Sequence, residues 1–321
     1  MHVADAGPSR RSAAILIGGL VLIGLAAVAG LSIAHGSSPA EATARISLLT
    51  HVGSVILGVI AAGSMLRVGS HVRPGNPLRR IWVLLGVGMV AYSLGDAVWA
   101  ALIAGSGSEA AVRPIAADLF YLVMYAFVIA GLTRTAIAFG RAARVRKPMM
   151  AGIVVALLAA AALFVTLTLP ILSAPSASPV SKVLGVAYPM ADVLLLAGPA
   201  AFVLLAVPSI GRFGVTRQWW LLGFGLLTMS LADIGLIWVR STGHYFSGHP
   251  VDFAWMVGLL LVALAGSLAA DAAECHECEN DSPDSLVEVY GKYADALRAD
   301  LADDTQGLIY SAPGGRADAR D

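Results

Sequence analysis

The stretch that decides the fold runs from Trp82 to Asp96 and reads WVLLGVGMVAYSLGD. It is apolar and rich in glycine, yet it ends on an aspartate. A closely similar stretch, WWLLGFGLLTMSLAD, runs from Trp219 to Asp233 at a fixed offset of 137 residues. Apolar segments of this kind predict helices that cross a membrane, each with one carboxyl group at membrane depth.

The composition of the whole chain agrees with a membrane protein. Of 321 residues, 58% are hydrophobic and 13% are charged, and the mean hydropathy is +0.78. Soluble domains are roughly 45–50% apolar and about 25% charged. The composition therefore excludes a soluble globular enzyme, a disordered protein and a free nucleic-acid binder. The net charge is zero, but residues 1–270 are basic and residues 271–321 are acidic.

Eight segments are long enough to cross a hydrocarbon core, which needs about 20 apolar residues. Polar, glycine or proline clusters separate them, such as residues 73–77. The first segment follows Arg10 and Arg11 and is too long for a signal peptide, so we expect a retained signal anchor. The predicted spans are 13–34, 46–66, 81–104, 115–133, 149–172, 183–207, 218–239 and 251–270.

The distribution of lysine and arginine predicts the orientation. The N-terminus and the loops after spans 2, 4 and 6 hold 13 of these residues, whereas the alternate loops hold 4. Because short cytoplasmic loops carry the excess, we expect a multi-pass protein of the cell membrane with both termini in the cytoplasm. Residues 1–12 then form a cytoplasmic N-terminus and residues 13–270 the transmembrane domain. Residues 271–321 form an acidic, partly disordered cytoplasmic tail.

The repeated stretch indicates that the chain consists of two related halves. The fourth and eighth spans also match, though more weakly: Pro114-Ile-Ala-Ala-Asp118-Leu-Phe-Tyr121 faces Pro250-Val-Asp252-Phe-Ala-Trp255. Halves of four helices each, about 13–138 and 149–270, would be parallel, because each contains an even number of spans. The alternative is that glycine-rich apolar helices simply look alike. The expected fold class is an all-α integral membrane protein with eight transmembrane helices in two parallel four-helix repeats.

Five aspartates lie within or at the ends of the predicted spans, without a lysine or arginine at comparable depth. Charged groups at such depth usually face a bundle interior or a wet cavity. At helical spacing, four of these aspartates, Asp96, Asp118, Asp192 and Asp252, share faces with tyrosine or tryptophan. We expect an outward-facing cavity that binds a cation, a small polar ligand or protons. The candidate ligand-binding residues are Asp96, Asp192, Asp233, Asp118, Asp252, Tyr92, Tyr121, Tyr188, Trp255 and His51.

A structural role is the alternative for every one of these residues. A buried aspartate can accept hydrogen bonds and hold two helices together. Asp118 and Asp252 follow prolines at predicted helix starts, where a carboxylate favours the helix dipole. A histidine such as His51 is often part of a core, and tyrosine and tryptophan often lie at the membrane interface. The deeper aspartates, Asp96, Asp192 and Asp233, are the ones for which we favour a function.

The tail contains both cysteines of the chain, Cys275 and Cys278. Such a pair is a weak candidate for a metal site, because zinc takes four ligands; a reduced thiol pair is the alternative. We expect no cofactor. Residues 284–303 could form a helix with an apolar stripe that docks a cytoplasmic signalling partner or forms a homodimer. The lipid bilayer is an expected partner, and nucleic acid is not. No P-loop, Rossmann or common hydrolase motif occurs, which disfavours an enzyme.

Four runs in order across residues 80–270 carry a family resemblance. They are Ser93-Leu-Gly-Asp-Ala-Val-Trp99, Ala117-Asp-Leu-Phe-Tyr-Leu-Val-Met-Tyr125, Tyr188-Pro-Met-Ala-Asp-Val-Leu-Leu-Leu196 and Asp252-Phe-Ala-Trp255. This arrangement resembles the multi-span N-terminal region of actinobacterial cyclic-di-GMP signalling proteins, whose cytoplasmic parts are GGDEF and EAL domains. The resemblance implies a sensory input role. Because no GGDEF or EAL motif follows the eighth span, it implies an input module without its output enzyme.

Two alternative functions remain open. Ser-Leu-Gly-Asp in the third span and Ser-Leu-Ala-Asp in the seventh are similar to paired motifs of eight-span lysoplasmalogenases, which hydrolyse vinyl-ether lysolipids. That family carries a histidine in its fourth span, where this chain has Asp118 instead. A proton- or cation-coupled transporter of small solutes is the third possibility.

Overall fold

The computed structural model describes residues 9–36, 39–72, 74–106, 115–143, 154, 158, 161–162, 164–173, 179–195, 213–243, 245 and 249–278. Every regular element in these ranges is helical. The long helices are α1 (Arg10–Gly36), α2 (Pro39–His71), α3 (Pro77–Ser106), α4 (Ile115–Ala143), α7 (Pro179–Leu195), α10 (Phe213–Ser241) and α11 (Pro250–Cys278). A π-helical turn, η2 (Phe164–Thr168), leads into the short helix α6 (Leu169–Ser173).

Among the described residues, six helices are long and apolar enough to cross a membrane: α1, α2, α3, α4, α10 and α11. They confirm the first four predicted spans and the last two as helices of membrane-spanning length, and they support a membrane location. Most of these helices extend several residues beyond the predicted spans, since polar residues at the ends continue the helix. Parts of the fifth and sixth predicted spans, 149–172 and 183–207, lie outside the described residues.

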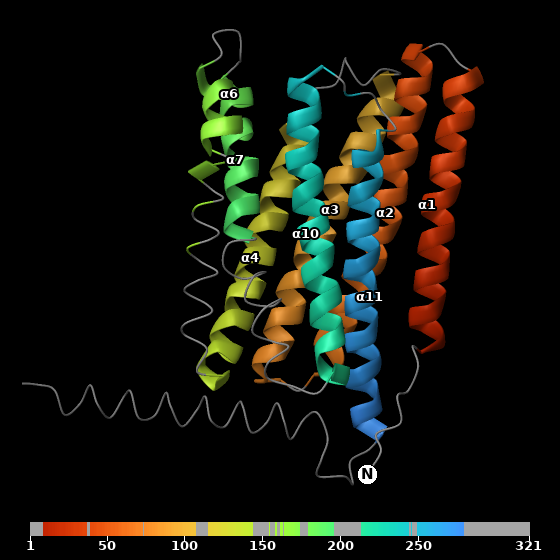
Figure 1. The fold of residues 1–321 in the computed structure, drawn as a ribbon. Helices are drawn as coiled ribbons and strands as arrows, with labels where there is room; N and C mark the ends of the chain where they lie inside the picture. The colour runs from red at the N-terminus through yellow and green to blue at the C-terminus, as the bar shows by residue number, and fades with distance from the viewer. Residues whose placement is uncertain are drawn as a thin grey trace, which may run out of the picture.

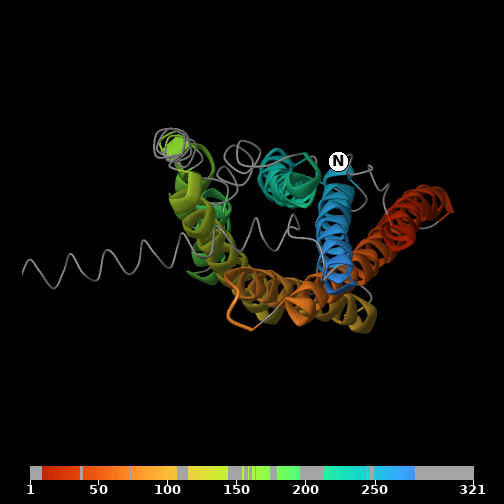
Figure 2. The same cartoon turned by 90° about the horizontal axis from the view of Figure 1, so that it is seen from below.

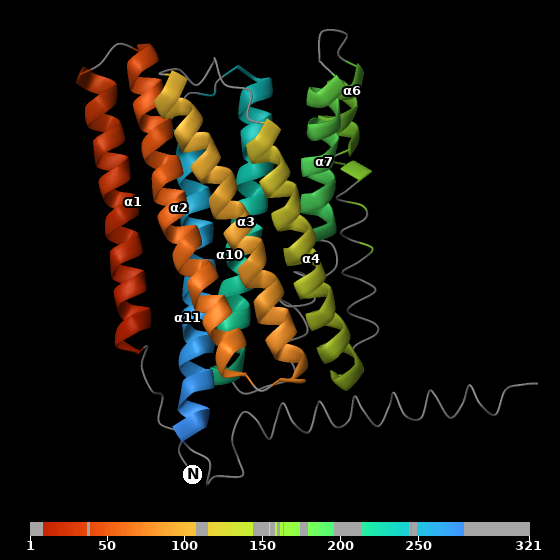
Figure 3. The same cartoon turned by 180° about the vertical axis from the view of Figure 1, so that it is seen from behind.

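The helices stand roughly side by side, so that the start of α1 and the end of α11 lie at the same end of the bundle (Figure 1). We call this the Arg10 end and the opposite end, where α4, α7 and α11 begin, the Pro250 end. Helix α2 packs against α3, α3 against α4 and α4 against α7, while α11 packs against both α10 and α2. Figure 3 shows α1 to α4 as neighbours in chain order. Helix α11 therefore lies beside α1 and α2, although these helices are far apart in the sequence.

Helix α1 lies at the edge of the bundle, where it contacts α2 and α11 (Figure 2). Apolar side chains on its outer faces, such as Ile17 and Leu25, are exposed, as expected of a peripheral helix in contact with lipid. The helices at the centre approach one another more closely. A Cβ atom on Gly225 of α10 would lie 2.8 Å from the carbonyl oxygen of Gly258 on α11. This crossing therefore requires glycine, as is common between membrane helices.

Trp82 and Trp219, the first residues of the two matching stretches, meet inside the core. Their ring centroids are 5.2 Å apart, with an interplanar angle of 34°. Both side chains are almost fully buried, and they join α3 to α10 on the Arg10 side of the aspartates. The repeated tryptophan thus has a packing role.

Ionic contacts cluster at the Arg10 end. Helix α11 does not end at residue 270, where the predicted span ends, but continues to Cys278. Its last turns carry Asp271 and Glu274, which contact the start of α1 and the end of α2. The hydroxyls of Ser9 and Ser12 donate to Asp271, and Glu274 pairs with Arg11, Arg67 and His71. The beginning of the predicted acidic tail is therefore part of the bundle.

Candidate functional site

Asp96, on α3, lies in the buried interior. It is ten residues before the end of the helix, which places it about 15 Å from the Pro250 end. Its Oδ1 atom accepts a hydrogen bond of 2.7 Å from the Tyr121 hydroxyl and lies 2.9 Å from Nδ1 of His51. The His51 ring is stacked on Trp99, with centroids 5.5 Å apart and planes inclined by 8°. Helices α2, α3 and α4 therefore meet at one carboxyl group.

Gly95 makes this contact possible. A Cβ atom at position 95 would lie 2.6 Å from the Tyr121 ring, so only glycine lets that ring lie flat against α3. The Tyr92 ring also contacts the Tyr121 ring, and the two ring centroids are 5.5 Å apart. The sequence Ser-Leu-Gly-Asp thus combines a carboxylate with the space that its hydrogen-bond donor needs.

A second carboxyl centre joins three further helices. Tyr125 on α4 donates a hydrogen bond of 2.6 Å to Oδ1 of Asp192 on α7. The same hydroxyl lies 2.9 Å from Oδ2 of Asp233 on α10. Trp255 of α11 donates from Nε1 to the other Asp233 oxygen at 3.0 Å. One tyrosine hydroxyl therefore connects two carboxyl groups that lie 41 residues apart in the sequence.

The number of hydrogen atoms at this centre is informative. A tyrosine hydroxyl has one hydrogen to donate, although its oxygen can also accept. If Tyr125 donates to Asp192, the 2.9 Å contact with Asp233 is a hydrogen bond only when Asp233 carries a hydrogen and donates it to the tyrosine oxygen. The reverse assignment places that hydrogen on Asp192. Both contacts of the Tyr125 hydroxyl are therefore hydrogen bonds when Asp192 and Asp233 together carry one hydrogen.

Two carboxyl oxygens in this region have no hydrogen-bond partner among the described residues. They are Oδ2 of Asp96 and Oδ2 of Asp192, on side chains whose residues are 2% and 0% exposed. Ser230 of α10 is also buried, and its hydroxyl interacts with the Asp192 carboxyl group without forming a well-aligned hydrogen bond. Buried polar atoms of this kind are uncommon and call for an explanation, such as a bound ion, a water molecule or a proton. We refer to Asp96, Asp192, Asp233 and their donors His51, Tyr121, Tyr125 and Trp255 as the inner acid cluster.

Asp118 lies apart from the inner acid cluster, nearer the Pro250 end. It is in the first turn of α4, about 5 Å from the start of the helix. Its Oδ1 accepts a hydrogen bond of 2.6 Å from the Tyr188 hydroxyl of α7. The Tyr188 ring in turn contacts the Tyr125 ring edge-on, with centroids 6.3 Å apart. Tyr188 therefore touches both Asp118 and the inner acid cluster.

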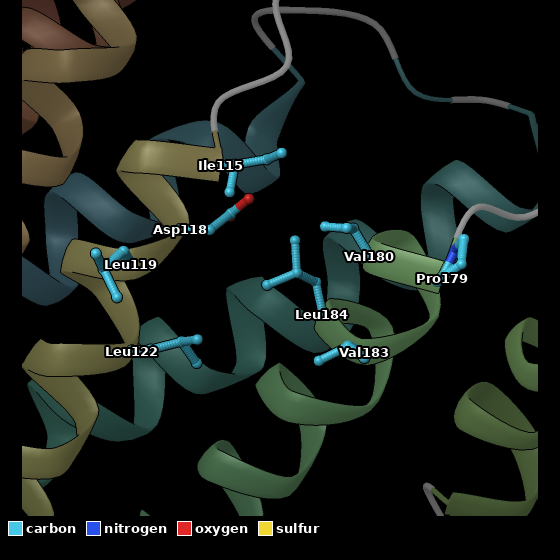
Figure 4. Close-up of a pocket in the computed structure, with 8 residues that line it drawn as sticks. All are labelled: Ile115, Asp118, Leu119, Leu122, Pro179, Val180, Val183 and Leu184. Carbon is cyan, nitrogen blue, oxygen red and sulfur yellow. The ribbon is translucent and has the colours of Figure 1, made fainter.

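A pocket of about 310 Å³ adjoins Asp118 between α4 and α7 (Figure 4). Apart from the carboxyl group, it is lined by seven apolar residues of the two helices. The predicted cavity was to be lined by several carboxylates and aromatic rings. Of the predicted site residues, this pocket contains Asp118 alone. The inner aspartates are instead joined by direct hydrogen bonds.

Asp252 is part of neither the inner acid cluster nor the pocket beside Asp118. It lies in the first turn of α11, where its Oδ1 accepts a hydrogen bond of 3.2 Å from Tyr245. Its backbone N–H donates to the carbonyl of His249. The side chain that caps the helix is His249, whose Nδ1 accepts from the Val251 N–H at 3.2 Å. Asp252 lies in the first turn, where the helix dipole favours a carboxylate, as the structural alternative holds.

The structure thus brings together Asp96, Asp192, Asp233, Tyr92, Tyr121, Trp255 and His51. It links Tyr188 to them through its ring contact with Tyr125, and Asp118 through its hydrogen bond with Tyr188. The predicted set of site residues did not include Tyr125, which contacts two aspartates, although its spacing placed it on one helix face with Asp118 and Tyr121. Its spacing of four residues after Tyr121 was the available signal, because both rings then share a helix face.

Metal binding remains a prediction. Within the described residues, three or more histidine, cysteine or acidic side chains do not come together in a way that could hold a metal. Cys275 and Cys278 lie at the end of α11, but their side chains are outside the described part of the structure. The predicted helix 284–303 also lies outside it.

Taken together, the fold and the site define a helical membrane-type protein with a buried acidic and aromatic cluster. A comparison with known proteins found no matching family model, no similar curated protein and no similar solved structure. The resemblance to the input regions of cyclic-di-GMP signalling proteins therefore stays a prediction.

Proposed function

We propose that the chain is a membrane signal-input module and that its stimulus acts at the inner acid cluster. The observation that carries this proposal is the Asp192–Tyr125–Asp233 contact, in which one hydroxyl lies between two buried carboxyl groups. Ionisable groups at membrane depth are costly and commonly mark ion pathways or proton relays. A purely structural contact between two helices would need only one aspartate and one donor.

Of the three predicted stimuli, the geometry supports protons best. Tyr125 contacts Asp192 and Asp233 at 2.6 and 2.9 Å, and Trp255 contacts Asp233 at 3.0 Å, so a larger ligand could lie between these side chains only if the helices separated. A proton needs no space beyond a hydrogen bond. The unpartnered oxygens of Asp96 and Asp192 provide further positions that a proton or a small cation can occupy.

Helix α11 is the proposed output element. Trp255, near its start, donates to Asp233, and Glu274, near its end, is held by Arg11, Arg67 and His71. Between them the helix rises about 29 Å. A change in protonation at Asp233 would alter its hydrogen bond to Trp255 and so shift helix α11. The other end of α11 is followed in the sequence by the acidic tail. A signalling partner at that tail remains part of the proposal.

The two cysteines of the chain allow a direct test. In a Cys275→Ala variant, Cys278 is the single thiol for an environment-sensitive fluorophore at the end of α11. The labelled protein in lipid nanodiscs is titrated with acid at constant sodium and potassium, and then with each cation at constant pH. We expect a pH-dependent signal that Asp233→Asn removes.

Glu41→Gln is the matched control, because Glu41 is an exposed carboxylate in the first turn of α2, away from the cluster. It should leave the titration unchanged. If the fluorescence changes with cation concentration at constant pH, the stimulus is a cation and not a proton. A signal that survives in Asp233→Asn, or no signal under any condition, would contradict the proposed input role.

The two-half architecture is also proposed, and corresponding contacts support it. Asp96 accepts from Tyr121 on the next long helix, and Asp233 accepts from Trp255 on the next long helix. Tyr121 and Trp255 are the residues that the weaker sequence match places opposite each other. Together with the Trp82–Trp219 contact, these pairs fit two related four-helix units.

The hydrolase alternative has one specific observation in its favour, the His51–Asp96 contact. A histidine oriented by a carboxylate is a common general base. Release of aldehyde from a vinyl-ether lysolipid by the purified protein, and its loss in His51→Asn, would favour this alternative over the input role. The transporter alternative stays a prediction without a specific contact behind it.

A further inference from the structure

We propose that the pocket between α4 and α7 is a lateral lipid site, in which one acyl chain lies between the helices and an amine headgroup binds Asp118. This site is separate from the inner acid cluster and does not depend on its function. At about 310 Å³, the pocket is at the lower end of the range of ligand pockets, large enough for part of one chain.

The lining of the pocket suits an acyl chain. Leu119 and Leu122 of α4 and Val183 and Leu184 of α7 line it, and Figure 4 shows Leu184 directed toward α4. Leu119 and Val183 are 62% and 65% exposed. In a membrane-spanning bundle, apolar side chains with that exposure face lipid. The pocket therefore opens sideways into the bilayer, where acyl chains are available.

The position and state of Asp118 suit a headgroup. It lies about one helical turn below the start of α4, close to the level at which headgroups meet the hydrocarbon core. Tyr188 donates to Oδ1 at 2.6 Å, whereas Oδ2 makes no hydrogen bond with the described residues. A carboxylate held by one donor and half-exposed beside an apolar pocket is complementary to a cationic N–H donor.

The same chemistry selects among lipids. A primary ammonium, as in phosphatidylethanolamine, offers both positive charge and N–H donors to Oδ2. A trimethylammonium headgroup offers charge without a donor. A phosphatidylglycerol headgroup has no cation, and its net negative charge opposes Asp118. We therefore expect the order ethanolamine, choline, glycerol.

The test uses the full chain in nanodiscs with lipids that carry a photoactivatable group on one acyl chain and one of the three headgroups. Crosslinked peptides are identified by mass spectrometry. We expect the ethanolamine lipid to label residues 115–122 and 179–184 preferentially and to be displaced by its unlabelled form. Asp118→Asn should lower this labelling about 10-fold, the effect of losing one charge-assisted hydrogen bond.

Two further variants separate the pocket from the headgroup contact. Leu184→Trp fills the space between α4 and α7 and should reduce labelling by all three lipids. Leu231→Trp, on the exposed face of α10, and Glu41→Gln are the controls and should have no effect. Equal labelling by the three lipids, unchanged in Asp118→Asn, would show ordinary contact with the surrounding bilayer and overturn the proposal. Stronger labelling by the glycerol lipid would overturn it as well.

Discussion

Asp96 and Asp233 end the two matching stretches, yet their surroundings differ. Each accepts one hydrogen bond from an aromatic residue of the next long helix, Tyr121 at 2.7 Å and Trp255 at 3.0 Å. The second partner of Asp96 is an imidazole, His51. The second partner of Asp233 is the hydroxyl of Tyr125, which Asp192 shares.

This difference shows how one motif can serve two purposes. Oδ1 of Asp96 thus has two partners that it does not share with another aspartate, the Tyr121 hydroxyl and the His51 imidazole. The Asp192–Asp233 pair has only one hydroxyl hydrogen between two acceptors. Its geometry is satisfied by a further hydrogen on one of the aspartates. We infer that the shared hydrogen belongs to the Asp192–Asp233 centre.

Tyr125→Phe should have the largest effect on stability. It removes the hydroxyl that contacts both Asp192 and Asp233 and leaves one oxygen of each without that partner. Because a buried unsatisfied group costs about 1–3 kcal/mol, we expect a loss of about 2–5 kcal/mol. Equilibrium unfolding in mixed micelles measures it. A loss no greater than that of Tyr121→Phe would remove the distinction between the two centres.

Asp96→Asn should come next, with a loss of about 1–3 kcal/mol in the free energy of unfolding. The amide can still accept from Tyr121, but a neutral amide oxygen is a weaker acceptor for His51 than a carboxylate oxygen. The double variant with His51→Asn should lose less than the sum of the two single losses, because the two side chains contact each other. If the losses in the free energy of unfolding of the two single variants simply add in the double variant, the two side chains do not interact.

Tyr121→Phe should lower the free energy of unfolding by about 1 kcal/mol. Asp96 loses one donor but keeps His51, and the phenylalanine ring still fills the space beside Gly95. The same unfolding experiment measures the change. An effect as large as that of Tyr125→Phe would show that His51 does not support Asp96.

Asp192→Asn should have the smallest effect, below about 1 kcal/mol. An asparagine can donate its N–H to the Tyr125 oxygen, which leaves the tyrosine hydrogen for Asp233, so it reproduces the arrangement in which Asp192 carries the shared hydrogen. Thermal unfolding of this variant beside Asp96→Asn gives the comparison directly. A loss larger than that of Asp96→Asn would mean that Asp192 and Asp233 are both ionised.

Hydropathy alone was sufficient to predict the six described membrane-length helices, because a span is a property of about 20 consecutive residues. Helical spacing also predicted that Asp96 shares a helix face with Tyr92 and Trp99, and Asp192 with Tyr188. Hydropathy and helical spacing do not predict which helices contact one another. Tyr125 reaches Asp192 because α7 packs against both α4 and α10, and no local pattern encodes that placement.

The predicted cavity illustrates the same limit. Five aspartates at similar depth suggested one hollow, but hydrogen-bond donors from neighbouring helices determine whether carboxyl groups enclose space or contact a partner. At Asp96 and Asp233 the tyrosines and Trp255 come within hydrogen-bond distance. At Asp118 the smaller side chains of α7 leave a pocket beside the carboxyl group.

Infrared spectroscopy of the full chain in nanodiscs at neutral pH tests the central inference most directly, because a protonated carboxyl group has a carbonyl band distinct from that of a carboxylate. We predict one such band in the wild-type protein. It should disappear in both Asp192→Asn and Asp233→Asn and persist in Asp96→Asn. A wild-type spectrum without the band, or a band that only Asp96→Asn removes, would contradict a shared hydrogen at Tyr125.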